Sequence, residues 1–373
     1  MGCKNVCIGD VATYRKDSIK PVAGVTYRCY SLPAFDNCRS PEILDGSEIL
    51  SSKLKIEKGD ILVNKLNMRF KRIWPLNELD DNSVCSTEFL PLHPKESVDS
   101  VFLLYTLLSD SFTKELSGMR TGTSGSHQRV KPEWVLGYRF DLPDLDCQRK
   151  IGIVLAAIDL KIACNAKING YLSELCDAVY ANFIREKRGI DWHDGTLSEL
   201  IEIKYGKAHK NLADGPYPVY GSGGYMRSVE KPLSSGESVL IPRKGSLNHV
   251  MYVDEDFWTV DTMFFTIPRM PGAAKYAYQY VKGLDLASMN AGSAVPSMTV
   301  DILNGLQLAI PCKEALDELD SELQPTYSLI AQIRAESKVF VELRDSLLPK
   351  LMSGEIDVSK VDLTQLNSHL SDY

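Results

Sequence analysis

The sequence predicts an α/β (α+β) protein made of two similar halves, each a globule of mixed strands and helices followed by a long helix. Three observations support this prediction. Short segments recur in the same order along the chain, two long stretches have the apolar spacing of a coiled coil, and 373 residues exceed the usual size of one domain. We expect the two long helices to pack as an antiparallel coiled coil within a pseudo-twofold internal repeat.

The internal repeat rests on four pairs of matching segments. In chain order they are 8–11 with 197–200, 58–63 with 235–240, 121–126 with 291–296, and 175–184 with 343–352. The offset falls from 189 through 177 and 170 to 168, as expected if the first copy has longer loops. One such match would be weak, but four in the same order favour a true duplication.

Each globule is expected to contain a short buried strand and, before a Gly/Ser-rich loop, a helix. Residues 61–63 and 238–241 are short apolar runs near glycine or proline, which is typical of buried strands. The corresponding helices are predicted around residues 101–108 and 274–281.

The first long helix has the clearer pattern. Its apolar positions alternate by four and three, and they are Ile151, Leu155, Ile158, Ile162, Asn165, Asn169, Leu172, Cys176, Val179 and Phe183. This spacing predicts a coiled-coil seam, in which the two central asparagines would specify the register at some cost in stability. About 35 helical residues would span roughly 50 Å.

The second long helix has a related pattern, at Leu316, Leu319, Leu323, Ile330, Ile333, Phe340, Leu343, Leu347 and Leu351. Pro325 lies inside it, and we expect a kink or break there because proline removes a helical hydrogen bond. An ordinary helix hairpin in a core is the alternative, but the presence of the pattern in both copies favours the seam.

These elements predict five regions along the chain. They are a first globule at 1–145, a central helix at 146–189, a second globule at 190–311, a C-terminal helix at 312–356 and a tail at 357–373.

Composition excludes several classes of protein. There is no apolar run long enough for a membrane span, and the N-terminal residues lack a signal-peptide pattern, so a cytoplasmic protein is expected. The nine cysteines form no C-x-x-C pair, which argues against a zinc site or a disulfide framework. The net charge of -7 is uneven, because residues 312–373 carry 12 acidic against 6 basic side chains. A local basic patch can therefore still attract DNA.

Catalytic motifs are absent from the sequence. It contains neither the Asn-Pro-Pro-Tyr nor the Asp-Pro-Pro-Tyr tetrapeptide of amino-methyltransferases, and no G-x-x-x-x-G-K-[ST] phosphate loop. Residues 221–224 resemble a nucleotide loop only loosely, and a turn between strands explains them better. We therefore expect no catalytic residues, no metal and no cofactor in this chain.

Two pairs of segments are candidates for contact with DNA. The first pair is basic, and its candidate residues are Lys65, Asn67, Arg69, Lys71 and Arg72 in one copy and Arg243, Lys244, Ser246 and Asn248 in the other. The second pair comprises the two loops, with Ser124, Ser126, His127 and Gln128 in one copy and Ser293 and Ser297 in the other. Lys and Arg can neutralise phosphates, and Arg, Asn and Gln can pair with base edges.

The basic runs could instead be solvated strand surfaces and the loops plain turns, so the equivalence of the two copies is what favours DNA. Tyr220 and Ser222 are further candidates near the same face, although the glycines around them favour structural turn chemistry.

With these residues laid out, the chain resembles the specificity subunits of Type I restriction-modification enzymes. Residues 347–356, Leu-Leu-Pro-Lys-Leu-Met-Ser-Gly-Glu-Ile, closely resemble that family's C-terminal signature. Residues 142–159 are similar to the start of its central helix, and residues 206–224 to the opening of a target-recognition domain. The departures are Pro325 and the acidic C-terminal segment.

The resemblance implies a non-catalytic protein with two target-recognition domains, each reading one half of a bipartite site in double-stranded DNA. The two helices would act as a spacer and as a docking surface for two modification (adenine methyltransferase) subunits, which restriction subunits would join. S-adenosylmethionine, ATP and Mg²⁺ would be bound by these partners.

Two other classes stay open at this point. One is a coiled-coil adaptor or scaffold that never touches DNA, and the other is a diverged DNA methyltransferase or nuclease. Salt-dependent, sequence-specific DNA binding would separate the first from a recognition subunit, and a cofactor loop or a bound metal would favour the second.

Overall fold

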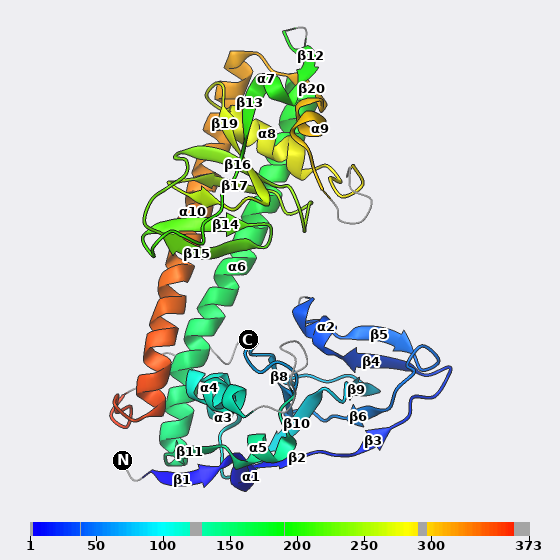
Figure 1. Ribbon diagram of the computed structural model, residues 1–373, viewed down its shortest axis with the longest axis vertical. Coiled ribbons are helices and arrows are strands. Elements are labelled where there is room, and N and C mark those ends of the chain that lie inside the picture. The colour runs from blue at the N-terminus through cyan, green and yellow to red at the C-terminus, as the bar shows by residue number, and fades with distance from the viewer. Residues whose placement is uncertain (1–2, 38, 120–128, 190, 290–296, 362–373) are drawn as a thin grey trace. The chain divides into compact units, whose positions relative to one another are not determined.

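The computed structural model describes residues 3–37, 39–119, 129–189, 191–289 and 297–361. Two compact units divide the chain, the first from residues 1–164 and 336–373 and the second from residues 165–335. Helices α6 (Leu145–Lys187) and α10 (Lys313–Met352) each contribute residues to both units (Figure 1). Within the described residues, no helix combines the length and the hydropathy that crossing a membrane requires.

Besides their parts of α6 and α10, the described residues of the first unit form sixteen elements in chain order. They are β1 (Lys4–Cys7), α1 (Ile8–Val11), β2 (Ala12–Tyr14), β3 (Ser18–Ile19), β4 (Thr26–Tyr30), α2 (Leu32–Asp36), β5 (Glu42–Asp45), β6 (Lys53–Lys55), β7 (Ile61–Asn64), β8 (Ile73–Pro75), β9 (Ser83–Cys85), β10 (Phe89–Pro94), α3 (Ser100–Leu108), α4 (Asp110–Gly118), α5 (Pro132–Gly137) and β11 (Arg139–Leu142).

The second unit follows the same plan. Its further elements are β12 (His193–Thr196), α7 (Leu197–Leu200), β13 (Ile201–Tyr205), β14 (Tyr217–Gly221), β15 (Gly224–Val229), β16 (Glu237–Pro242), β17 (Met251–Asp254), β18 (Trp258–Thr259), β19 (Met263–Pro268), α8 (Ala273–Lys282), α9 (Val300–Asn304) and β20 (Gln307–Ile310).

The sheets confirm the predicted internal repeat. The first unit pairs β1 with β11 and orders four strands β2-β10-β7-β8, and the second pairs β12 with β20 and orders four strands β13-β19-β16-β17. The units differ in their third sheet, which has the order β3-β6-β9-β4-β5 in the first and β15-β14-β18 in the second. A common framework therefore carries two different additional sheets.

Local sequence explains why the repeat begins alike in both units. A carboxylate one turn into each short helix accepts the N–H of the residue that caps it, from Cys7 to Asp10 at 2.8 Å and from Thr196 to Glu199 at 2.9 Å. Both predicted strands and both predicted helices are present, as β7 and β16 and as α3 and α8. Gly59 and Gly236 precede the two strands with φ of 89° and 80°, a conformation that favours glycine.

The long helices confirm the predicted seam on α6. Six of its ten predicted positions are buried and the other four are half-buried. The central Asn165 is buried at 1% exposure. In the first unit, Asp159 and Lys161 of α6 contact Arg344 and Glu336 of α10, at 2.8 and 3.0 Å. The residue numbers fall along α10 as they rise along α6, so this part of the pair is antiparallel.

Helix α10 departs from its prediction in two details, the absence of a break at Pro325 and the exposure of Leu343. The helix continues without a break through Pro325, whose ring lies on the exposed side of the helix. Water can therefore hydrate the carbonyl of Ser321 that loses its helical donor. Leu343 is 41% exposed, whereas its neighbour Arg344 is half-buried against Asp159.

Replacing Pro325 with alanine is expected to stabilise the second unit by about 1–3 kcal/mol, since proline is the poorest residue inside a helix and its side chain here is exposed. Thermal unfolding followed by circular dichroism measures the change, with Gln324→Ala as the control at an adjacent exposed position. A lower melting midpoint for Pro325→Ala than for the unaltered protein would contradict this prediction, because it would mean that the proline stabilises α10.

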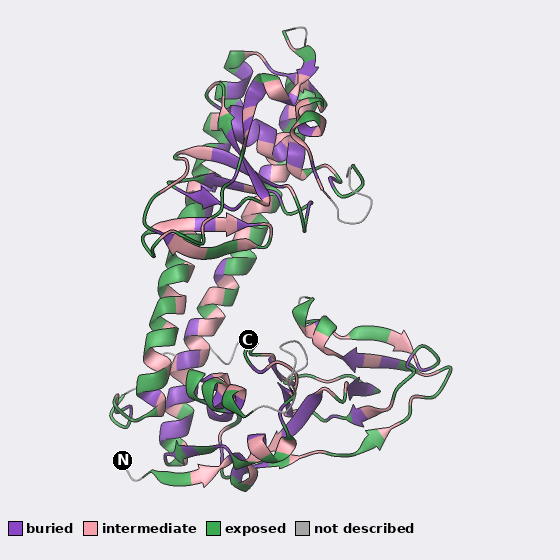
Figure 2. Ribbon diagram, in the orientation of Figure 1, coloured by how far each residue is buried: buried purple, intermediate pink, exposed green. Residues whose placement is uncertain are grey.

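Each unit has its own core. In both units the strands of the four-stranded sheet are largely buried (Figure 2). The core of the first unit joins α3 to the start of α6 and the end of α10, and the core of the second unit joins α8 to the C-terminal part of α6 and the N-terminal part of α10. The long helices are thus part of each unit's core, which fixes the sheets on them.

Candidate nucleic-acid interface

In both units a basic segment follows a strand of the four-stranded sheet, β7 in the first unit and β16 in the second. This segment lies beside the residues that follow the Gly/Ser-rich loop, 129–130 in the first unit and 297–298 in the second. Leu66 forms an isolated bridge with Arg129 in the first unit, and Lys244 forms one with Ser297 in the second. The backbone bonds agree, because Val130 N–H donates to the Lys65 carbonyl and Met298 N–H to the Arg243 carbonyl, both at 2.9 Å. The structure therefore brings together the two kinds of segment that the sequence suggested separately.

Part of the predicted site lies outside the described residues, namely Ser124, Ser126, His127, Gln128 and Ser293. The described candidates are Lys65, Asn67, Arg69, Lys71 and Arg72 in the first unit and Tyr220, Ser222, Arg243, Lys244, Ser246, Asn248 and Ser297 in the second.

The first unit presents its basic residues on a tight turn between β7 and β8. Asn67 has a φ of 53°, Phe70 N–H donates to the Asn67 carbonyl at 3.0 Å, and Arg72 N–H donates to the Phe70 carbonyl at 2.8 Å. Asparagine tolerates this left-handed conformation better than most residues. Arg69 and Phe70 are consequently exposed at the tip, while Met68 is buried beneath it.

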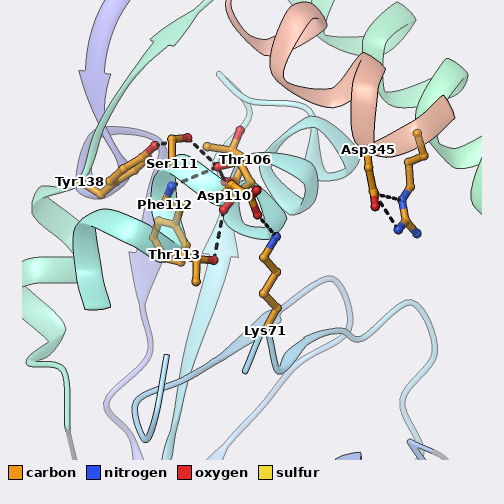
Figure 3. Close-up of polar contacts among 10 residues, drawn as sticks. Lys71, Thr106, Asp110, Ser111, Phe112, Thr113, Tyr138 and Asp345 are labelled. Carbon is orange, nitrogen blue, oxygen red and sulfur yellow. Dashed lines mark hydrogen bonds and ion pairs between the residues drawn. The ribbon is translucent and has the colours of Figure 1, made fainter. Parts of the chain in front are cut away.

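Several cations of this turn already have carboxylate partners. Lys71 Nζ lies 2.5 Å from Asp110 at the start of α4 (Figure 3). Arg72 donates two hydrogen bonds of 2.7 Å to Asp36 at the end of α2. The hydrogen bonds from Arg72 lower the pKa of Asp36, and those to Asp36 raise the pKa of Arg72. These side chains therefore fix the turn and are less available to DNA than the sequence suggested.

Lys65 and Arg129 lie at the base of the same turn. Burial lowers the pKa of Lys65, and the nearby Glu88 opposes that effect. Glu88 also forms an ion pair of 2.5 Å with Arg129. Sequence reasoning missed Glu88, Asp36 and Asp110 because their partnership with the basic turn exists only in the folded unit.

The corresponding segment of the second unit has two cations, Arg243 and Lys244, and Lys244 has no carboxylate partner among the described residues. The N–H groups of Arg243 and Lys244 both donate to the Thr262 carbonyl, at 2.8 and 3.2 Å. The Arg243 guanidinium lies over the Tyr205 ring, 5.5 Å from its centre. Lys244 and Ser246 are exposed, and within the described residues Lys244 has no ion pair.

Asn248 is exposed and also has a structural role. Its amide donates to Asp285 at 3.0 Å and accepts the N–H of Ala287 at 2.9 Å. It therefore joins the β16–β17 segment to the chain after α8, which leads into the second Gly/Ser loop. These two hydrogen bonds occupy part of the amide, which leaves one N–H and one acceptor site of the side chain.

A cleft of about 430 Å³ lies beside this segment in the second unit. It is lined by the glycine turn 221–224 together with His209, Tyr225, Asp261 and Thr262, among others. Ser222 belongs to this lining, and its carbonyl lies 2.8 Å from His249 Nδ1. Tyr220 is on β14 and donates to Glu255 at 2.5 Å. Sequence reasoning missed Tyr225, which is 58% exposed; only its place beside the turn could have indicated it.

Comparison with known proteins matches part of the chain to a known family. Residues 189–336 match the family model of the Type I restriction modification DNA specificity domain. Over these residues the chain is similar to the specificity subunits of Type I restriction-modification enzymes. The matched DNA specificity domain includes β12 to β20 and therefore all the candidate residues of the second unit.

Two known proteins are similar to this chain. The HindI specificity subunit of the Type I restriction enzyme from Haemophilus influenzae is 27% identical over 133 residues, which is 35% of this chain and 29% of that subunit. The crystal structure of the S subunit of a Type-I restriction-modification system from M. genitalium superposes with a TM-score of 0.56 at 15% identity. The superposition covers 94% of this chain and 96% of the M. genitalium subunit, and it supports the fold alone.

Proposed function

We propose that this chain is the non-catalytic DNA-recognition subunit of a Type I restriction-modification complex and reads a bipartite site in double-stranded DNA. Residues 1–145 and 190–311 are the two target-recognition domains, joined by helices at 146–189 and 312–356. One observation carries the proposal. In both units the basic segment after β7 or β16 lies against the end of a Gly/Ser loop. Equivalent backbone hydrogen bonds join them, from Val130 to Lys65 and from Met298 to Arg243.

The same proposal assigns the chemistry to partners. Two modification subunits, which are adenine methyltransferases, bind S-adenosylmethionine, and restriction subunits bind ATP and Mg²⁺. The match of residues 189–336 to a DNA specificity domain and the similarity to the HindI specificity subunit support a recognition role for this chain within such a complex. The complex would act in the cytoplasm, where it meets DNA.

Sequence-specific binding tests the proposed function. The chain, purified with its modification subunits, should bind a duplex with both half-sites at least about 1000-fold more tightly than a scrambled duplex. Scrambling either half-site alone should remove most of that preference. Equal affinity for cognate and scrambled duplexes would contradict a recognition role and favour a coiled-coil adaptor.

Replacing Lys244 with alanine is expected to weaken binding about 3- to 10-fold on every sequence, because a lysine that contacts phosphate contributes equally whatever the base sequence. The slope of log affinity against log salt should decrease in magnitude by about 1. Lys313→Ala, an exposed lysine at the start of α10, is the matched control and should change neither quantity. Loss of preference between sequences would instead assign Lys244 to base readout.

A further inference from the structure

Phe70 is the exposed phenylalanine of this protein. The other ten are buried or half-buried, whereas the Phe70 side chain is 48% exposed at the tip of the β7–β8 turn. Burying a phenylalanine stabilises a protein by about 1.5–3 kcal/mol, so this turn forgoes part of that gain. A single exposed apolar residue is common, so the exposure of Phe70 does not by itself indicate a function.

The ring is held in place by two arginines. The Arg69 guanidinium lies over the Phe70 ring at 4.9 Å from its centre, and the Arg72 guanidinium lies over it at 5.0 Å. Arg72 is itself fixed by its two hydrogen bonds to Asp36. Each cation–π contact contributes about 0.5–1 kcal/mol at an exposed site. The side chain is thus preorganised on a surface with basic residues on both sides.

These contacts cover at least one face of the ring. A ring that slides between two base pairs needs both of its faces, so a guanidinium group over either face opposes such insertion. The edge of the ring is apolar and has no hydrogen-bonding atom. In the major groove the one apolar group at a base edge is the C5-methyl of thymine.

Two neighbouring cations, Lys71 and Arg72, are less suited to reading bases. Lys71 is paired with Asp110 and Arg72 with Asp36, and both carboxylates would have to give up a cation before it could reach a base. We propose that Phe70 reads a thymine methyl group in the half-site of the first unit. This inference rests on the proposed function and adds a specificity-determining residue to it.

The test removes the methyl group from the DNA and the ring from the protein. The full chain with its modification subunits is bound to the cognate duplex, in which each thymine of both half-sites is replaced in turn by deoxyuridine. For one position we expect about fourfold weaker binding, the value for one buried methyl group. In the complex with Phe70→Ala, binding to the thymine duplex is weaker by at least that factor, and the deoxyuridine replacement has no further effect.

Controls separate contact from folding. Phe70→Leu keeps an apolar edge and should keep part of the thymine preference. Leu50→Ala removes another side chain of the first unit that is 97% exposed, and it should keep the whole preference. Unchanged melting midpoints show that the variants fold.

The inference is overturned if no thymine replacement weakens binding, if the half-sites contain no thymine, or if the effect persists in Phe70→Ala. In those cases cognate duplex is still preferred over scrambled duplex and the proposed function stands. Loss of that preference in the unaltered complex would overturn both.

Discussion

Replacing Lys275 with methionine is expected to lower the free energy of unfolding of the second unit by about 3 kcal/mol. The Lys275 side chain on α8 is 1% exposed, and its Nζ lies 2.6 Å from both Glu237 of β16 and Asp320 of α10. Burial alone lowers the pKa of Lys275, but the two carboxylates outweigh it and raise the pKa above its ordinary value. Methionine would leave two carboxylates facing each other without a cation.

The expected loss lies at the lower end for buried pairs because Glu237 and Asp320 remain 24% and 30% exposed. Lys282→Met on the same helix is the matched control. Lys282 is 28% exposed and pairs with Asp177 at 2.6 Å, so its loss should cost less than about 1 kcal/mol. Urea unfolding of both variants measures the difference.

Neutralising the carboxylates provides a further check. Adding Glu237→Gln and Asp320→Asn to Lys275→Met should restore part of the stability, because no unpaired charge then remains. Equal losses for Lys275→Met and Lys282→Met would contradict the account of this cluster.

Shortening both long helices by one heptad is expected to change the gap between the half-sites and to leave both half-sequences unchanged. The removed residues are 162–168 of α6 and 332–338 of α10, which surround the boundary between the two units. Seven residues shorten a helix by about 10 Å, which is about three base pairs of DNA. A heptad turns the seam by only about 20°, so the remaining apolar positions still face each other.

Removing the heptad from α6 alone is the control. It would shift the remaining α6 seam against α10, and we expect an unstable protein. Sequencing of methylated sites from cells that express each variant with the modification subunits measures the gap. An unchanged gap, or altered half-sequences, would contradict the role of the helices as a spacer.

The long helices could be predicted because their signal is local. A four-and-three spacing repeats over many turns, and each of the ten predicted seam positions between Ile151 and Phe183 proved buried or half-buried. The register failed only at Leu343, because Arg344 reaches Asp159 and takes the half-buried position. The break expected at Pro325 is absent because the proline lies on the exposed side of α10, where water can hydrate the carbonyl that loses its helical donor.

The candidate site was less predictable, since its charges are neutralised by residues distant in the sequence. Asp36 and Asp110 lie 36 and 39 residues from their partners Arg72 and Lys71. No spacing rule connects them, so a basic run was taken as more available than it is. The contact between the basic segment and the loop could not be predicted from the sequence either. Lys65 and Val130 are far apart in the chain, and only the folded unit brings them within hydrogen-bonding distance.

Mapping of methylated adenine across a genome tests the central claim most directly. The chain is expressed with its modification subunits in a host that lacks DNA methylation. The account predicts one new motif of two short blocks separated by a fixed gap. An unsplit motif, or no methylation despite a stable complex, would contradict the claim that this chain reads a bipartite site.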